Sequence, residues 1–182
     1  MNINQEIWLE LSIEEILIEE YNTVWPLLSA ILIRELKGLY KFDNDSFEHI
    51  GSTSVPDLPG KPIIDIMLPV DNFDDIGAIM LSLEPENWNL ISPELTGTYY
   101  QRMFVKTIND KRCAHFYLIL NDHPEVLRRI TFRDILRQYP LFANEYAQLK
   151  EGLAQMYHDD RDGYESAKTD FVNTVLGRIT LY

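Results

Sequence analysis

Apolar residues recur at helical spacing near the start of the chain. Trp25, Leu32 and Leu36 follow one another at intervals of seven and four residues. Residues at these intervals share one face of an α-helix, so the pattern predicts a helix over residues 23–38. The residues before it, 13–20, mix hydrophobic alternation with acidic side chains and predict an edge strand.

Four β-rich runs come next. Residues 47–50 form a short run that enters a glycine turn, and residues 62–70 are nearly all apolar. A run of the second kind is typical of a strand buried on both faces, in the middle of a covered sheet. Residues 99–107 and 113–120 are separated by Asn109-Asp110, whose turn chemistry predicts a β-hairpin.

Helical patterns lie between and after these strands. Residues 71–83 and 124–139 predict two helices, and a third carries an apolar stripe over residues 142–156. A polar break at residues 158–163 precedes a last helix that includes residues 171–179. The order of elements predicts an α+β fold, with a mixed sheet flanked by helices and a helical C-terminal third.

Length and composition bound the class of protein. The chain has 182 residues, 46% of them apolar, which suits a single domain over residues 1–182 with a core of its own. Cys113 is the only cysteine, so an intramolecular disulfide is excluded and a reducing compartment is expected. Neither a secretory signal nor an apolar run near the ~20 residues that span a bilayer is present. We therefore expect a cytoplasmic protein with no membrane partner.

The charge of the chain limits the classes of binding partner that we expect. The formal net charge is −13, and no run of five or more lysines and arginines exists. Such a field repels the phosphate backbones of DNA and RNA, so a nucleic-acid polymer is not expected as a partner. A few local donors are enough to bind a small nucleotide or another phosphorylated ligand, and that partner class stays open.

Candidate chemistry gathers between the first two predicted strands. Lys61 adds a positive charge there, and Asp65 lies within an apolar strand, where an unpaired carboxylate is costly to bury. A cation, a metal ion or several hydrogen bonds must therefore compensate Asp65, the alternative being a buried ion pair with Lys61 or an arginine. The turn before them supplies backbone freedom and hydroxyl donors for an anion, or only a structural turn. Its residues are Gly51, Ser52, Thr53 and Ser54.

The segment is not a P-loop. That motif needs a second glycine followed by lysine and a hydroxyl residue that lead into a helix. Here Gly60-Lys61 is followed by Pro62, which removes a backbone donor and leads into a strand, and Pro56 stands where the first glycine would be.

An ordered set of sequence motifs resembles the signature of the GrpB family. The main motifs are residues 48–56, with the sequence Glu-His-Ile-Gly-Ser-Thr-Ser-Val-Pro, then Leu58, and then residues 61–66, with the sequence Lys-Pro-Ile-Ile-Asp-Ile. The likeness extends over nearly the whole chain. Its further motifs are Tyr21 to Pro26, His115, Phe132 to Arg137, Tyr146, Leu149-Lys150, Tyr164 and Lys168.

This resemblance implies a nucleotidyltransferase-like fold of the polymerase-β type. In that superfamily a Gly-Ser turn holds nucleotide phosphates, and a following strand carries two acids, two residues apart, that share Mg²⁺. Asp65 matches the first acid, but Met67 stands at the second position, and a thioether is a poor Mg²⁺ ligand. The GrpB pattern itself tends to be apolar at this position, so Met67 departs from the superfamily and not from the family. Tyr117 falls where the second histidine of a His-x-His pair is usual, and Asp57 and Pro59-Gly60 also depart from the family pattern.

The resemblance and the residues together give a set of expected roles. Asp65 is the expected Mg²⁺ ligand and, with His115, a catalytic residue; Gly51 to Ser54 and Lys61 are expected to bind the ligand. A basic wall is expected to join them, the alternative being salt bridges to Asp134, Glu145 or Glu165. The wall consists of Arg102, Arg133, Arg137, Lys150 and Lys168.

Three functions follow from these roles. The leading hypothesis is a metal-assisted nucleotidyltransferase-like enzyme that acts on a nucleotide and a small acceptor. The alternative is a non-catalytic module that binds a nucleotide or another anion and has a degenerate metal site. A third is a hydrolase that uses a metal or a histidine, which requires Asp65 and His115 to converge within about 5 Å of one point.

Overall fold

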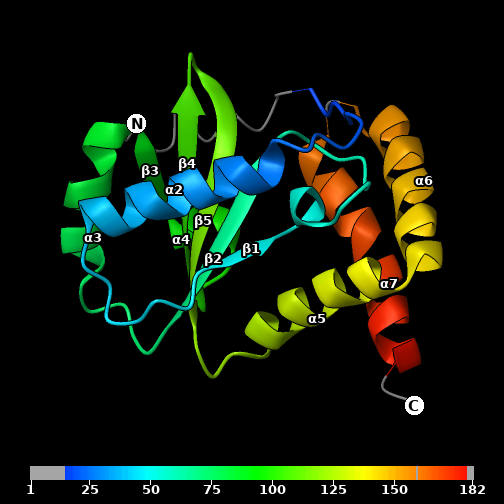
Figure 1. Cartoon of the computed structure of the whole chain (residues 1–182). Coiled ribbons are helices and arrows are strands. Elements are labelled where there is room, and N and C mark those ends of the chain that lie inside the picture. Colours follow the sequence, from blue (N-terminus) through cyan, green and yellow to red (C-terminus); the bar gives the residue numbers. More distant parts are fainter. Residues whose placement is uncertain (1–14, 159, 180–182) are drawn as a thin grey trace.

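A five-stranded mixed sheet forms the centre of the protein (Figure 1). The computed structural model describes residues 15–158 and 160–179. The strand order is β1-β2-β5-β4-β3, with β2 and β5 parallel and the other neighbouring pairs antiparallel. The strands are β1 (Glu48–Ile50), β2 (Ile64–Val70), β3 (Trp88–Ile91), β4 (Gln101–Ile108) and β5 (Lys111–Leu120).

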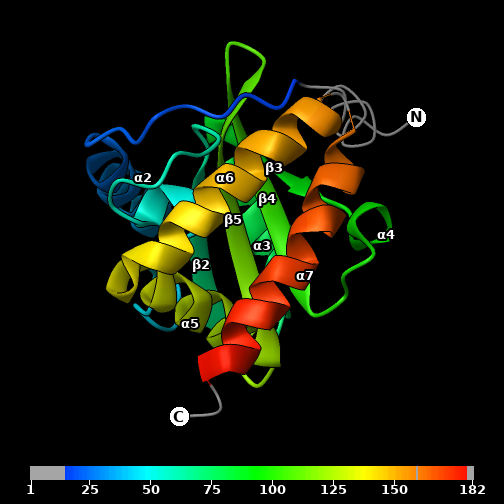
Figure 2. The same ribbon diagram turned by 90° about the vertical axis from the view of Figure 1, so that its right-hand side faces the viewer.

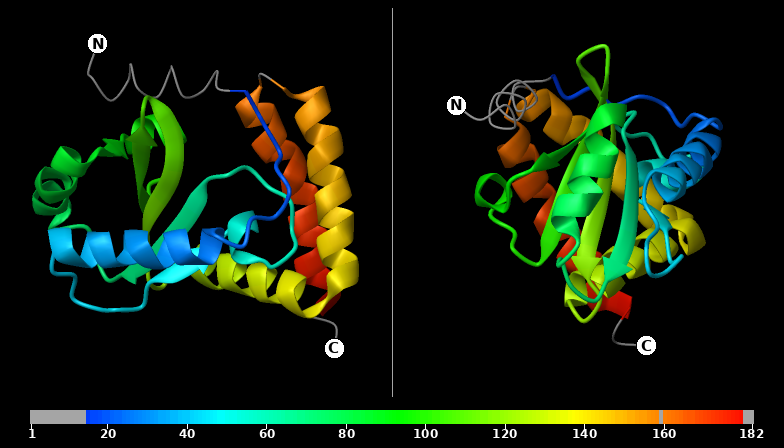
Figure 3. Two further views of the ribbon diagram at one scale, coloured as in Figure 1. Left: turned by 45° about the horizontal axis from the view of Figure 1, so that its top comes forward. Right: turned by 90° about the vertical axis from the view of Figure 1, so that its left-hand side faces the viewer.

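Helices cover both faces of this sheet. α2 and α3 pack on one face, while α5, α6 and α7 contact one another and lie on the other side (Figures 1 and 2). Figure 3 shows α6 and α7 running side by side, with α5 crossing near one end of the pair. The helices are α2 (Trp25–Leu39), α3 (Ile76–Leu83), α4 (Pro93–Thr96), α5 (Pro124–Gln138), α6 (Pro140–Met156) and α7 (Arg161–Ile179).

The two faces of β2 serve different purposes. Side chains alternate along a strand, so Ile64, Ile66 and Leu68 point to one face and enter the main core beneath α2 and α3. Asp65 and Met67 point to the opposite face, which is the face toward the C-terminal helices. Apart from Asp65, the apolar pattern of this strand thus reflects burial on both sides.

The structure confirms the expected α+β class, with its mixed sheet, flanking helices and helical C-terminal region. The predicted helix at residues 23–38 is Trp25–Leu39, and the predicted hairpin joins β4 to β5. Asn109 and Asp110 have φ values of 52° and 59°, the paired left-handed conformation of a tight hairpin turn. In the described part of the chain, no helix is both long and apolar enough to cross a membrane.

Two local predictions were wrong. The strand expected at residues 13–20 is reduced to an isolated bridge between Glu19 and Gly60, and residues 13 and 14 lie outside the described residues. In the described part of this segment, Glu19 exchanges two backbone hydrogen bonds with Gly60 and the Ile16 N–H donates to the His158 carbonyl, but these bonds do not form a ladder. The helix expected at residues 71–83 begins only at Ile76, and β3 was not predicted.

Candidate functional site

A cavity of about 630 Å³ lies between the second face of the sheet and the C-terminal helices. Among the residues that the structure describes, eight of the sixteen lysines and arginines of this acidic chain line it, together with four acids. The cavity wall is therefore net positive although the chain as a whole is net negative. The basic residues are Lys61, Arg112, Arg128, Arg129, Arg133, Lys150, Arg161 and Lys168; the acids are Asp65, Glu125, Asp162 and Glu165.

The Gly51 turn touches Asp65 directly. Gly51 has φ 71° and ψ −175°, a conformation that is essentially restricted to glycine. A Cβ added to it would lie 2.3 Å from Oδ2 of Asp65, so only glycine lets the turn approach the carboxylate. Ser52 to Ser54 continue as a 3-10 turn, in which the Ser54 hydroxyl donates to the Gly51 carbonyl at 2.6 Å. The turn and the strand residue expected to act together are thus adjacent.

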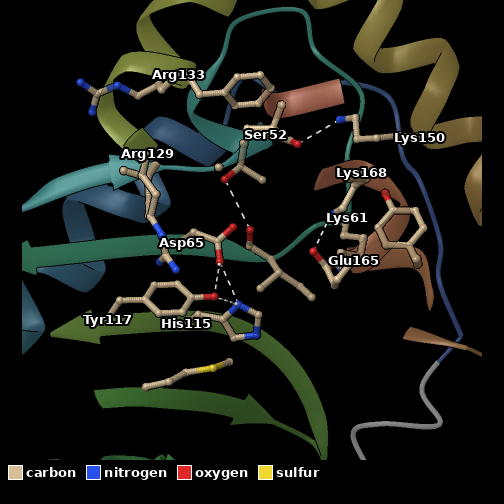
Figure 4. Close-up of a pocket in the computed structure, with 18 of the residues that line it drawn as sticks. Ser52, Lys61, Asp65, His115, Tyr117, Arg129, Arg133, Lys150, Glu165 and Lys168 are labelled. Atoms are coloured by element: carbon tan, nitrogen blue, oxygen red, sulfur yellow. Dashed lines mark hydrogen bonds and ion pairs between the residues drawn. The ribbon is translucent and has the colours of Figure 1, made fainter. Parts of the chain in front are cut away.

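The polar side chains of His115 and Tyr117 lie next to Asp65 on the sheet. Register places Asp65 opposite His115 on the neighbouring strand, and Oδ1 of Asp65 lies 2.8 Å from Nδ1 of His115 (Figure 4). The Tyr117 hydroxyl donates to the same carboxylate oxygen at 3.4 Å and lies 3.1 Å from Nδ1 of His115. The predicted convergence of Asp65 and His115 is therefore present, with Tyr117 as a third member.

Arg112 fixes the tautomer of His115. Its Nη1 lies 3.3 Å from Nε2 of His115, and an arginine nitrogen can only donate, so Nε2 must carry the lone pair. The proton then resides on Nδ1, which donates to Asp65. Burial lowers the pKa of His115 although Asp65 opposes the shift, so the ring is neutral at pH 7. Burial would raise the pKa of Asp65, but the hydrogen bond from His115 and the charge of Lys61 lower it overall.

Two lysines and a glutamate occupy the α7 side of the cavity. Lys61 and Lys168 each contact the carboxylate of Glu165 at 2.6 Å, and both ammonium groups lie near the ring of Tyr164. Burial lowers the pKa of Lys61 to about 8; Glu165 raises it and Lys168 lowers it further. Against the opposing effect of burial, Lys168 and Lys61 hold the pKa of Glu165 well below its usual range.

A third lysine approaches the glycine turn from α6. Lys150 is 2% exposed, and its Nζ donates to the Ser52 hydroxyl at 2.9 Å and to the Pro59 carbonyl. Burial lowers its pKa to about 7, and the nearby charges of Lys168 and Lys61 add to the shift. Near pH 7 the side chain of Lys150 therefore exchanges between the ammonium form and the neutral amine.

Arginines of α5 form the opposite wall. Arg129 donates to Glu125 at 2.9 Å and to Gln101 at 3.0 Å, and its guanidinium lies 4.5 Å from the centre of the Tyr117 ring. Arg133 extends away from Asp65 in Figure 4 and contacts Glu48 at 2.5 Å. These pairs hold the guanidinium groups in fixed positions along one helix face.

The structure brings together most of the predicted site residues. Gly51, Ser52, Thr53, Lys61, Asp65, His115, Arg133, Lys150 and Lys168 all line the cavity. Three others do not line it. Ser54 bonds within its own turn, Arg137 donates to the Ser54 carbonyl at 2.8 and 3.0 Å, and Arg102 stacks 4.1 Å from the ring centre of Phe73.

Salt bridges account for part of the expected basic wall. Arg133 contacts Asp134 at 2.8 Å, as the alternative interpretation expected, and Lys168 contacts Glu165. Sequence reasoning missed several lining residues, among them Arg112, Arg128 and Arg129, and it named Glu165 only as an alternative salt-bridge partner. A signal existed for Arg129, because it lies four residues before Arg133 and so continues the same helix face.

The donor set around Asp65 does not fit Mg²⁺. Oδ1 of Asp65 already accepts from His115 and Tyr117, and Met67, at the second acid position, is fully buried in an apolar cluster. Both ring nitrogens of His115 are used by protein partners, so no lone pair remains for a metal. Within residues 15–158 and 160–179, no group of three histidine, cysteine or acidic residues is arranged to hold a metal ion.

Comparison with known proteins identifies the family. The family model described as GrpB protein matches residues 15–178. This chain belongs to the GrpB family. The UPF0157 protein YqkA of Bacillus subtilis is 28% identical over 85% of the chain, and the UPF0157 protein PA4798 of Pseudomonas aeruginosa is 32% identical over 85%. The chain spans only 44% and 63% of the length of these two relatives.

A solved structure of the GrpB family shares the fold. The crystal structure of the conserved protein GrpB from Enterococcus faecalis has a TM-score of 0.78 and 31% sequence identity to this chain. The match covers 87% of this chain and 94% of that protein. This chain therefore has the fold of a GrpB protein.

Proposed function

We propose that this GrpB-family protein binds a phosphorylated small molecule of nucleotide size in the cavity beside Asp65. The observation that carries the proposal is the concentration of half of the lysines and arginines on one cavity of an acidic chain. The described lining residues include more cations than acids, and a phosphate would balance the excess positive charge. The volume of about 630 Å³ lies within the range of small-molecule sites.

The positions of the cations support a ligand with an extended negative charge. Lys61, Lys150 and Lys168 approach from the loop, α6 and α7, while Arg129 approaches from α5. Glu165 now bridges Lys61 and Lys168, so a carboxylate already occupies the place between two cations that a phosphate oxygen would take. Apolar side chains between these groups suit the uncharged part of a ligand.

Titration calorimetry with ATP and with inorganic pyrophosphate, in EDTA and in Mg²⁺, tests the proposal. Lys61→Ala should weaken binding roughly 10-fold or more, because a charge-assisted hydrogen bond is worth about 1.5–3 kcal/mol. Lys111→Ala is the matched control, since it removes the same charge at the start of β5, outside the cavity. No binding of either compound at millimolar concentration, or equal losses in both variants, would contradict the proposal.

Nucleotidyl transfer is a second candidate. The contact between the Gly51 turn and Asp65 favours it, since a phosphate held by the turn would lie beside a carboxylate. Mg²⁺ is the cofactor that such a reaction would use, and the donor set described above argues against a pre-built site for it. Transfer of a nucleotide to an acceptor that required Mg²⁺ and was lost in Asp65→Ala would support this candidate; turnover unchanged in that variant would exclude it.

A further inference from the structure

Ser52 and Lys150 form a close pair at the edge of the cavity. Oγ of Ser52 lies 2.9 Å from Nζ of Lys150, and Figure 4 shows the two side chains pointing toward each other from the turn and from α6. Gly60 makes room for them, because a Cβ there would lie 2.8 Å from Cβ of Ser52 and 3.6 Å from Nζ of Lys150. Both residues line the cavity, so a ligand can reach the hydroxyl.

The surroundings of Lys150 favour the neutral amine. Its side chain is buried, lies 4.9 Å from the ring centre of Tyr146, and faces the charges of Lys168 on α7 and Lys61 on the loop before β2. Glu151, on its own helix, opposes them only weakly, and the pKa falls to about 7. A neutral amine can donate to the Pro59 carbonyl and still accept the proton of the Ser52 hydroxyl.

We propose that Ser52 and Lys150 act as a serine–lysine catalytic pair that hydrolyses an acyl phosphate held in the cavity. A serine paired with a neutral lysine is an established way to activate a hydroxyl nucleophile. The proposal rests on the proposed binding of a phosphorylated ligand, because the leaving phosphate needs cations. Lys61 and Lys168 supply them on the same cavity wall.

The reaction balances in two steps. In the first, Lys150 takes the proton of the Ser52 hydroxyl, Oγ bonds to the carbonyl carbon, and the bond from that carbon to the phosphate oxygen breaks. The phosphate leaves with the proton from Lys150, and the acyl group remains as an ester on Ser52. In the second, Lys150 takes a proton from water, the hydroxide adds to the ester carbon, and Ser52 regains its proton. One water is consumed, and a carboxylate, phosphate and one proton are released.

Covalent labelling with a fluorophosphonate and phosphate release from acetyl phosphate test the pair. Mass spectrometry should find one adduct, on Ser52, and the labelling rate should rise as the pH increases through about 7. Ser52→Ala should abolish labelling, and Lys150→Arg, which keeps the charge but cannot act as a base at this pH, should slow it roughly 100-fold. Ser82→Ala, in α3 and outside the cavity, is the control and should label like the wild type.

Other results would overturn the inference. Unchanged labelling in Lys150→Arg, an adduct elsewhere than on Ser52, or acetylation of Lys150 itself would each refute the pair; circular dichroism shows whether each variant is folded. Pyrophosphate binding without labelling or phosphate release would refute the pair and leave the proposed function standing. Labelling without pyrophosphate binding would refute the proposed function and, with it, acyl phosphate as the substrate.

Discussion

Replacing Gly51 with alanine should disrupt the contact on which the site depends. The backbone at Gly51, with φ 71° and ψ −175°, lies in a region that costs a residue with a side chain about 1–3 kcal/mol. The new Cβ would also lie 2.3 Å from Oδ2 and 3.1 Å from Cγ of Asp65. Asp65 cannot move away freely, because it sits on the second strand of the sheet and is bonded to His115.

These two effects set the expected magnitude. Forcing a methyl group into a packed site costs about 1–3 kcal/mol, so strain and overpacking together should lower the free energy of unfolding by about 2–6 kcal/mol. Gly152→Ala is the matched control. Gly152 lies inside α6 with nothing within 4 Å of an added Cβ, so alanine there should raise the free energy of unfolding by about 1 kcal/mol. Urea unfolding followed by circular dichroism measures both.

A double-mutant cycle separates the clash from the backbone strain. Asp65→Ala removes the two atoms nearest to the added Cβ, Oδ2 and Cγ. The double variant Gly51→Ala with Asp65→Ala should therefore be more stable than the sum of the single effects, by about 1 kcal/mol or more. The reasoning is refuted if the free energy of unfolding of Gly51→Ala lies within about 0.5 kcal/mol of the wild-type value, or if the effects of the two substitutions on it are additive.

Three further predictions concern the charges of the cavity. Pyrophosphate binding at pH 8 should take up protons, because Lys61, with a pKa of about 8, is partly neutral until an anion arrives. Calorimetry in two buffers of different ionisation enthalpy measures the uptake, and zero uptake contradicts the prediction. Folding lowers the pKa of Lys150, so the unfolded chain binds more protons than the folded chain between pH 7 and the usual lysine pKa of 10.5. The free energy of unfolding of the wild type, measured in urea relative to Lys150→Met, should therefore rise with pH in that window. His115→Ala should lower the free energy of unfolding by about 2 kcal/mol because it leaves a partly buried carboxylate without its main donor, whereas Tyr117→Phe should cost about 1 kcal/mol. Equal losses in denaturant titrations would argue against this ranking.

Local patterns predicted the parts of the fold that local physics decides. The β4–β5 hairpin follows from Asn109 and Asp110, which tolerate positive φ, and α2 follows from its apolar spacing. β3 escaped prediction because its four residues are too few to show alternation. The strand expected at residues 13–20 failed because its described residues meet backbone partners at two separate places, Gly60 and His158, instead of one neighbouring strand, and no local pattern specifies such partners.

In the candidate site, too, some contacts could be predicted from local sequence and others depend on residues far apart in the chain. The approach of Gly51 to Asp65 was within reach of sequence reasoning, since a turn that enters the antiparallel partner of a strand lies beside that strand. The partner of Lys61 was not, because Glu165 is 104 residues away along the chain and reaches it only through the packing of α7. Arg102 shows the reverse error. It was grouped with the basic wall by its charge, whereas its guanidinium stacks on Phe73, away from the cavity.

The distribution of charge ties these observations together. A net charge of −13 disfavours the approach of any polyanion from a distance, yet the cavity wall has more cations than anions. Exposed charges are screened beyond about 8–10 Å at physiological salt, so a small ligand inside the cavity experiences the local cations rather than the acidic surface. A long nucleic acid must also lie across that surface and is repelled by it. The proposed small phosphorylated ligand is therefore compatible with the acidic chain, and a nucleic-acid polymer is not expected as a partner.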